Sequence, residues 1–186
     1  MRLCVTGCAG FIGAHVVTCA LRGGSSVIGV DSLSPDYDVR LKEWRLRHLV
    51  RQSGFRFCRA DLTDQAALSQ ELEGELTAGE PVSAVIHLAG QVGLRRSLED
   101  PSACYESNVG GTLGLLELCR LTGVPRIVLA STAAVYTGPQ RQDALQEALP
   151  HALGVPEQSP VDSPYAASKR AAVSSFVCRL PPQVTG

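Results

Sequence analysis

A tyrosine and a lysine stand four residues apart in the segment Ser163-Pro-Tyr-Ala-Ala-Ser-Lys169. On a helix, residues at positions i and i+4 share one face, and Pro164 suits the first turn of such a helix. An ammonium beside a phenol favours the phenolate by charge, and a phenolate can act as a general base. Tyr165 and Lys169 are therefore candidates for proton transfer, the alternative being a solvent-facing pair without a catalytic role.

A hydroxyl side chain is expected near the same chemistry. Thr132 follows the apolar segment 127–130, and ligands of open parallel sheets bind at the carboxyl ends of the strands. Thr132 could share a hydrogen bond to a reacting oxygen, with its neighbour Ser131 as a competing candidate. For both residues the alternative is a hydroxyl that only satisfies the backbone of a turn.

Three glycines near the start of the chain have the spacing of a phosphate-binding turn. Gly7, Gly10 and Gly13 form G-x-x-G-x-x-G between an apolar segment, 3–6, and a helix expected over 11–22. The first glycine permits a sharp turn, the second lets the backbone approach a pyrophosphate, and the third allows close packing of the helix. A glycine turn that holds no ligand is the alternative.

Further cofactor contacts are expected at the start of this helix and after two strands. Phe11 and Ile12 occupy the first helical turn, where unpaired N–H groups attract phosphate. Asp31 ends the second apolar segment, where a carboxylate accepts from the adenosine ribose and repels a 2′-phosphate, which favours NAD over NADP. Asp61 and Leu62 follow the third strand, where an adenine could rest. The alternatives are a strand-end cap for Asp31 and a helix cap for Asp61.

Apolar segments alternate with helical patterns along the chain. Strands are expected at 3–6, 27–30, 55–58, 82–88 and 127–130, and helices at 11–22, 41–50, 64–76, 105–121 and 164–178. This alternation predicts a doubly wound α/β fold of the Rossmann type, a parallel sheet covered on both faces. Residues 1–186 are expected to form one NAD-binding domain. A short helix is expected near 142–148, and a sixth strand that begins near Val184 would leave the sheet incomplete at its C-terminal edge.

Composition excludes several classes of function. The 186 residues carry 17 basic and 18 acidic side chains, so the chain has no excess of positive charge that would favour binding to nucleic acid. The chain lacks an apolar segment of about 20 residues, so no membrane span is expected. Seven cysteines without C-x-x-C spacing indicate free thiols in a reducing cytoplasm, and the histidines show no metal-ligand spacing. The first strand follows Met1 directly, which leaves no room for a signal peptide.

Together these residues resemble the extended short-chain dehydrogenase/reductase family, the NAD-dependent sugar epimerases and dehydratases. The resemblance is carried by the glycine segment 5–13, His87-Leu-Ala-Gly90, Ser107-Asn-Val-x-Gly-Thr112, Ser131-Thr132 and Tyr165-x-x-x-Lys169. Within that family, segments 31–42, 61–64 and 91–98 are most similar to the UDP-glucuronate 4-epimerases.

The resemblance implies NAD as cofactor and a nucleotide sugar as substrate, UDP-glucuronate and UDP-galacturonate being interconverted through a 4-keto sugar. Tyr165 would take the proton of the sugar 4-hydroxyl, and Thr132 would share the hydrogen bond to that oxygen. Lys169 would hold the nicotinamide ribose, so that Tyr165 and Lys169 contact the cofactor too. Leu88 and Ala89 would line its central part. A homodimer through the helices at 105–121 and 164–178 is also implied.

Two departures from the family pattern bear on activity. Ala133 and Ala134 stand where related dehydratases and decarboxylases carry acidic residues, which disfavours those reactions. The carboxyl-terminal part that binds the nucleotide sugar in the family is expected to be absent from this chain. The alternative function is therefore an NAD-binding remnant without turnover.

Overall fold

The computed structural model describes residues 1–135 and 161–179, and the chain divides into two compact units. The first unit comprises Met1–Gly90 and Gly110–Ala130. The second comprises Gln91–Val109 and the described residues from Ser131 onward. The helix expected near 142–148 and the strand expected near Val184 lie outside the described residues.

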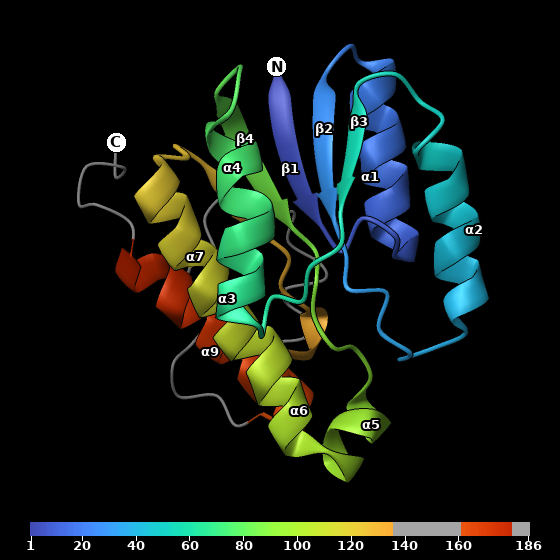
Figure 1. The fold of residues 1–186 in the computed structure, drawn as a ribbon. Coiled ribbons are helices and arrows are strands. Elements are labelled where there is room, and N and C mark those ends of the chain that lie inside the picture. The colour runs from blue at the N-terminus through green and yellow to red at the C-terminus, as the bar shows by residue number, and fades with distance from the viewer. Residues whose placement is uncertain (136–160, 180–186) are drawn as a thin grey trace, which may run out of the picture. The chain divides into compact units, whose positions relative to one another are not determined.

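Parallel strands form the sheet of the first unit (Figure 1). They are β1 (Arg2–Thr6), β2 (Ser26–Val30), β3 (Phe55–Cys58), β4 (Val82–His87) and β5 (Ile127–Leu129). Their order is β3-β2-β1-β4-β5, and every neighbouring pair is parallel. The winding direction therefore reverses between β1 and β4, which is the doubly wound topology that the alternating pattern predicted.

Helices cover both faces of this sheet. α1 (Phe11–Arg22) and α2 (Val39–Leu49) lie on one face, and α3 (Gln65–Leu68), α4 (Gly74–Thr77) and α7 (Gly111–Thr122) lie on the other (Figure 1). A π-helical turn, Ser69–Glu73, joins α3 to α4, so the helix predicted at 64–76 is present but locally widened.

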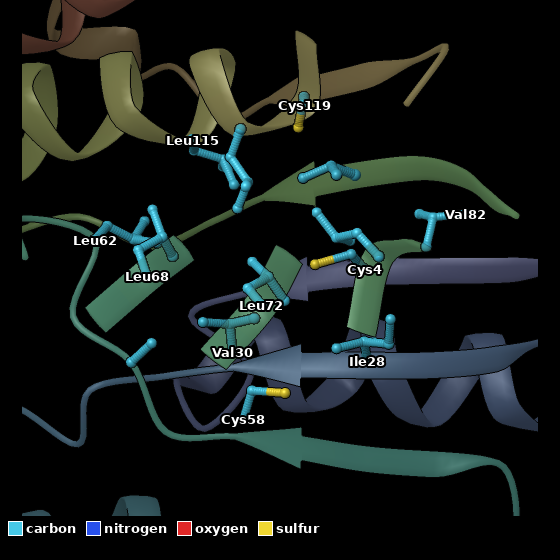
Figure 2. Close-up of a cluster of buried hydrophobic side chains, with 14 residues drawn as sticks. Cys4, Ile28, Val30, Cys58, Leu62, Leu68, Leu72, Val82, Leu115 and Cys119 are labelled. Atoms are coloured by element: carbon cyan, nitrogen blue, oxygen red, sulfur yellow. The ribbon is translucent and has the colours of Figure 1, made fainter. Parts of the chain in front are cut away.

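The strands separate two hydrophobic cores because successive strand residues point to opposite faces. In β1, Cys4 belongs to the core beneath α3, α4 and α7, and Val5 to the core beneath α1 and α2. Figure 2 shows the first of these cores, in which Leu72 and Leu115 come from the helices and Ile28 from the sheet. Full burial of a leucine or isoleucine stabilises the fold by about 1.5–3 kcal/mol, so both helical layers are needed to hold the strands.

The second unit is helical in its described part. It contains α5 (Leu94–Glu99), α6 (Pro101–Tyr105), most of the π-helix Glu106–Gly110, a 3₁₀ turn (Ala133–Val135) and α9 (Pro164–Arg179). α9 contacts α5, α6 and the 3₁₀ turn. None of the helices in the described residues combines the length and the apolar character that crossing a membrane requires.

The predicted start of one helix is wrong. The helix expected from 105 begins at Pro101, and α5 was not predicted at all. Asp100 caps α6 by accepting a hydrogen bond from the Ala103 N–H at 3.0 Å, with Pro101 in the first turn. An aspartate followed by proline is a recognised helix start. The predicted start at residue 105 relied instead on the helical pattern of 105–121.

Candidate cofactor and proton-transfer sites

The glycine turn of the first unit is tightly packed. The N–H groups of Gly7 and Cys8 both donate to the carbonyl of Val30, at 2.7 and 3.2 Å. Gly7 has a φ of +70°, and a Cβ added there would lie 2.8 Å from the Ala89 nitrogen. Only glycine adopts this backbone region at no cost, so the turn needs glycine both for its conformation and for its contact with the end of β4.

The N-terminus of α1 is available to an anion. Among the described residues, no side chain caps it at Gly10, and its first turn carries no acidic residue. Phe11 and Ile12 are 67% and 64% exposed. Uncapped N–H groups and the helix dipole attract negative charge, so this end of α1 fits the pyrophosphate of a dinucleotide.

Asp31 joins the glycine turn to the end of β2. Its carboxylate accepts from the Ala9 N–H at 3.0 Å and from the Leu33 N–H at 2.8 Å, and the residue is only 7% exposed. A carboxylate offers about four acceptor positions, so capacity remains for ribose hydroxyls. The role of Asp31 as a ribose acceptor stays a prediction, and the geometry fits it.

The residues after β3 divide between surface and core. Asp61 is exposed and accepts from the N–H and hydroxyl of Thr63, at 2.9 and 2.8 Å. The cap of the following helix is Asp64, which accepts from the Ala67 N–H, so the alternative role of Asp61 as a helix cap is wrong. Leu62 is 8% exposed and belongs to the core of Figure 2. Contact of Asp61 and Leu62 with an adenine stays a prediction.

A buried polar chain fixes the end of β4. The His87 ring lies between two hydroxyls, with Nδ1 2.7 Å from Thr6 Oγ1 and Nε2 3.0 Å from Thr112 Oγ1. Thr6 Oγ1 also accepts from the Ala89 N–H at 3.2 Å. These hydrogen bonds orient Leu88 and Ala89, which are half-buried beside the glycine turn. The sequence analysis did not predict this hydrogen-bond network. The polar residues Thr6 and His87 within apolar strands were the sequence signal that could have indicated it.

In the second unit, α9 carries the tyrosine and the lysine one helical turn apart. Ser163 begins this helix, its hydroxyl accepting from the Ala166 N–H at 3.1 Å. Tyr165 is half-buried, whereas Lys169 is 6% exposed. Burial lowers the pKa of Lys169 below its ordinary value, because a desolvated ammonium is disfavoured. The lysine is therefore buried and does not form part of a solvated face.

Asn108 anchors α9 to the π-helix. Its Nδ2 donates to Ser168 Oγ at 2.9 Å and to the Gln91 carbonyl at 3.1 Å, and the Ser168 hydroxyl donates to the Tyr165 carbonyl at 2.9 Å. Asn108 and Ser168 are buried. Single-turn π-helices are frequent at functional sites, and this one supplies a side chain that fixes the turn carrying Tyr165. Ser168 was not recognised from the sequence.

Thr132 belongs to the same unit as the other two proton-transfer candidates. It is half-buried, and its hydroxyl accepts from the Ala134 N–H at 3.3 Å, whereas Ser131 is exposed. The 3₁₀ turn that follows contacts α9. Thr132, Tyr165 and Lys169 thus come from two segments that pack together within one unit, and their catalytic roles remain predictions.

Replacement of Lys169 by methionine should raise the free energy of unfolding at neutral pH, by on the order of 1 kcal/mol, because a partly compensated buried charge is removed. Between the lowered pKa of Lys169 and 10.5, the unfolded chain binds a proton that the folded chain lacks. In that pH range, raising the pH therefore increases the free energy of unfolding of the wild-type chain relative to that of the variant. Urea titrations of both chains from pH 7 to 10.5 check this; a difference independent of pH would contradict it.

The chain belongs to the NAD dependent epimerase/dehydratase family, whose profile matches residues 3–177. The cofactor of that family is NAD, as the sequence predicted, and the predicted family is confirmed.

Relatives and solved structures agree with this assignment. The UDP-glucuronate 4-epimerase of Thermodesulfobacterium geofontis is 43% identical over 168 residues, 90% of this chain and 48% of that protein. UDP-glucuronate 4-epimerase 3 of Arabidopsis thaliana is 39% identical over 133 residues, 71% of this chain and 30% of that protein. The Bacillus cereus UDP-glucuronic acid 4-epimerase, solved with UDP-glucuronic acid and NAD, superposes with a TM-score of 0.76 at 27% identity, covering 96% of this chain and 52% of that one. The chain therefore spans about half the length, or less, of these proteins.

Proposed function

We propose that these residues supply the cofactor-binding and proton-transfer parts of a nucleotide-sugar 4-epimerase that acts on UDP-glucuronate. The observation that carries the proposal is that Tyr165 and the buried Lys169 lie one helical turn apart on α9, in a chain whose glycine turn leads into a helix without a side-chain cap. A solvent-facing pair would leave the lysine exposed.

The first unit would bind the dinucleotide. The N-terminus of α1 would hold the pyrophosphate between Gly7 and Gly13, and Asp31 would accept from the adenosine ribose. Asp61 and Leu62 would lie at the adenine, and Leu88 and Ala89 along the central part. When bound, NAD would take a hydride from carbon 4 of the sugar and give it back.

The second unit would move the proton. Tyr165 would take the proton of the sugar 4-hydroxyl as the carbonyl forms, and Thr132 would donate a hydrogen bond to the same oxygen. Lys169 would favour the deprotonated tyrosine by its charge and hold the nicotinamide ribose. Return of the proton from Tyr165, after the 4-keto sugar presents its other face, would give the epimer.

UDP-glucuronate is the proposed sugar because the relatives that bear this activity match the chain over most of its length. Ala133 and Ala134 follow Thr132 and cannot donate a proton, which disfavours loss of water. We also propose that residues 1–186 act as one NAD-binding domain and that the protein forms a homodimer. An NAD-binding remnant is the second candidate, since the chain spans about half the length of the relatives.

Calorimetric titration of the 186-residue chain with NAD tests the first step, and we expect binding with a dissociation constant of roughly micromolar order. The chain alone should not convert UDP-glucuronate to UDP-galacturonate. A chimera, in which residues 1–179 replace the matching part of the Thermodesulfobacterium epimerase, should convert it.

Tyr165→Phe should lower turnover of the chimera by at least about a hundredfold, because phenylalanine has no hydroxyl that could accept the proton of the sugar. Absence of NAD binding by the unsubstituted chain would refute the proposed function. A chimera that binds NAD but turns nothing over would favour the remnant.

A further inference from the structure

A buried lysine lies beside the carboxylate that the proposed function assigns to the adenosine ribose. Lys42 of α2 is 6% exposed, although lysine is rarely buried this fully unless it is paired. Its ammonium donates to the carbonyl and hydroxyl oxygens of Ser34, at 3.0 and 2.9 Å, and lies 4.0 Å from Asp31 Oδ1. Nothing in the proton-transfer chemistry or in the glycine turn requires a cation here.

The Asp31 carboxylate therefore occupies an anion site built by the chain itself. Two backbone N–H groups, from Ala9 and Leu33, point at its oxygens, and the Lys42 ammonium lies beside it. Leu33 is the one non-glycine residue with positive φ, +57°, among the described residues. Its left-handed backbone costs energy for a branched side chain, and its N–H is one of the two that hold the Asp31 carboxylate.

We propose that Lys42 sets the choice between NAD and NADP together with Asp31, an inference that rests on the proposed dinucleotide binding. With Asp31 present, the ammonium offsets the charge of the carboxylate and keeps the carboxylate in position to accept hydrogen bonds from the ribose hydroxyls. Without the aspartate charge, the lysine and the two N–H groups form a site for the 2′-phosphate of NADP. Lys42 is thus a positioning residue and a latent phosphate ligand.

The distances support this exchange of ligands. A ribose hydroxyl bound by Asp31 lies about 2.7 Å from a carboxylate oxygen, so a phosphate on that hydroxyl would extend into the space of the carboxylate. The ammonium is within 4.0 Å of that space, and lysine binds phosphate as a point charge. The Ser34 hydroxyl accepts from Lys42 and donates to Asp36 Oδ2 at 2.6 Å, so the charge of the ammonium, and not this hydroxyl, would attract the phosphate.

Four variants of the 186-residue chain separate the two residues: Asp31→Ser, Lys42→Met, the double variant, and Arg47→Met as a control on an exposed cation of the same helix. Each is titrated with NAD, NADP and adenosine 2′,5′-bisphosphate. The unsubstituted chain should prefer NAD by about tenfold or more, and Asp31→Ser should tighten NADP and the bisphosphate by about tenfold. The double variant should lose that gain, and Arg47→Met should leave every affinity within about twofold.

Lys42→Met alone should weaken NAD by about fivefold, because the buried carboxylate loses its cation. If lysine served only the stability of α2, Lys42→Met would lower the melting temperature without changing the NAD-to-NADP ratio. A gain in NADP affinity that persists in the double variant would overturn the inference.

Should Asp31→Ser fold poorly, Asp31→Asn keeps the side-chain shape without the charge, and thermal unfolding with and without the bisphosphate gives the same comparison. Failure of the unsubstituted chain to bind NAD would count against the proposed function. The bisphosphate titrations and a double-mutant cycle in the free energy of unfolding would still test whether Asp31 and Lys42 interact. Strictly additive changes in that free energy would show that they do not.

Discussion

Gly13→Ala should destabilise the first unit by about 3 kcal/mol or more and abolish NAD binding. A Cβ at Gly13 would fall inside contact distance of the Gly7 carbonyl oxygen, 2.8 Å from the Gly7 carbonyl carbon and 2.9 Å from Cys8 Cα. All three are backbone atoms, so no side chain can rotate away. The turn or the start of α1 would have to move, and both hold the proposed pyrophosphate site.

Helix propensity makes this result diagnostic. Gly13 lies within α1, where alanine in open space would stabilise the helix by up to about 1 kcal/mol. Gly74→Ala is the matched control, since Gly74 is helical and a Cβ there would meet nothing within 4 Å. Urea titrations should show a loss for Gly13→Ala and a small gain for Gly74→Ala, and calorimetry should show NAD binding only by the control. Equal stabilities of the two variants would contradict the packing argument.

Alkaline pH should unfold the first unit steeply above pH 9. Burial raises the pKa of the Cys119 thiol to about 12 and raises the pKa values of Cys4 and Cys8 well above the ordinary value, 9.0. Below pH 9 the thiols are protonated in both states, and the stability is complete. Above it the unfolded chain releases protons that the folded chain keeps, so each thiol lowers the stability by about 1.4 kcal/mol per pH unit.

Cys4, Cys8 and Cys119 give a slope of about 4 kcal/mol per pH unit, reduced by at most about 1.4 where Lys169 acts in the opposite sense. Burial also raises the pKa of Cys58, which steepens the slope. A domain of ordinary stability, about 5–15 kcal/mol, loses much of it within two units. Urea titrations in reductant between pH 8 and 10.5 measure the slope. Cys119→Ala should reduce the slope by about 1.4 kcal/mol per pH unit. A stability that stays flat to pH 10.5 would contradict the burial of these groups.

The sequence predicted the fold well because its signals are local. Continuous apolar strands that alternate with amphipathic helices admit few architectures, and the crossover rule fixes their hand. The bounds of α1 and β3 agree with the prediction to the residue. Glycine spacing located the turn for a similar reason, since conformation and packing both exclude a Cβ at Gly7 and Gly13.

The polar partners of the candidate sites were not predictable in the same way. Lys42 is one of several basic residues in α2 with no sequence signal that distinguishes it, and only the structure shows it buried beside Asp31. Ser168 looked like an ordinary helix residue, yet it receives the Asn108 amide across sixty positions of sequence. The partners in such pairs are far apart in the chain, so no local pattern reports them.

What the sequence determined by itself was the order of strands and helices, the glycine turn, the family and the identity of the proton-transfer candidates, because each follows from the spacing of neighbouring residues. Tertiary structure alone decided which charges are buried and which hydrogen bonds hold them: Lys42 with Asp31, His87 between Thr6 and Thr112, and Asn108 with Ser168. Burial is a property of the packed molecule, since desolvation depends on every element that covers a group. The electrostatic character of these sites therefore arises only when the layers close around them.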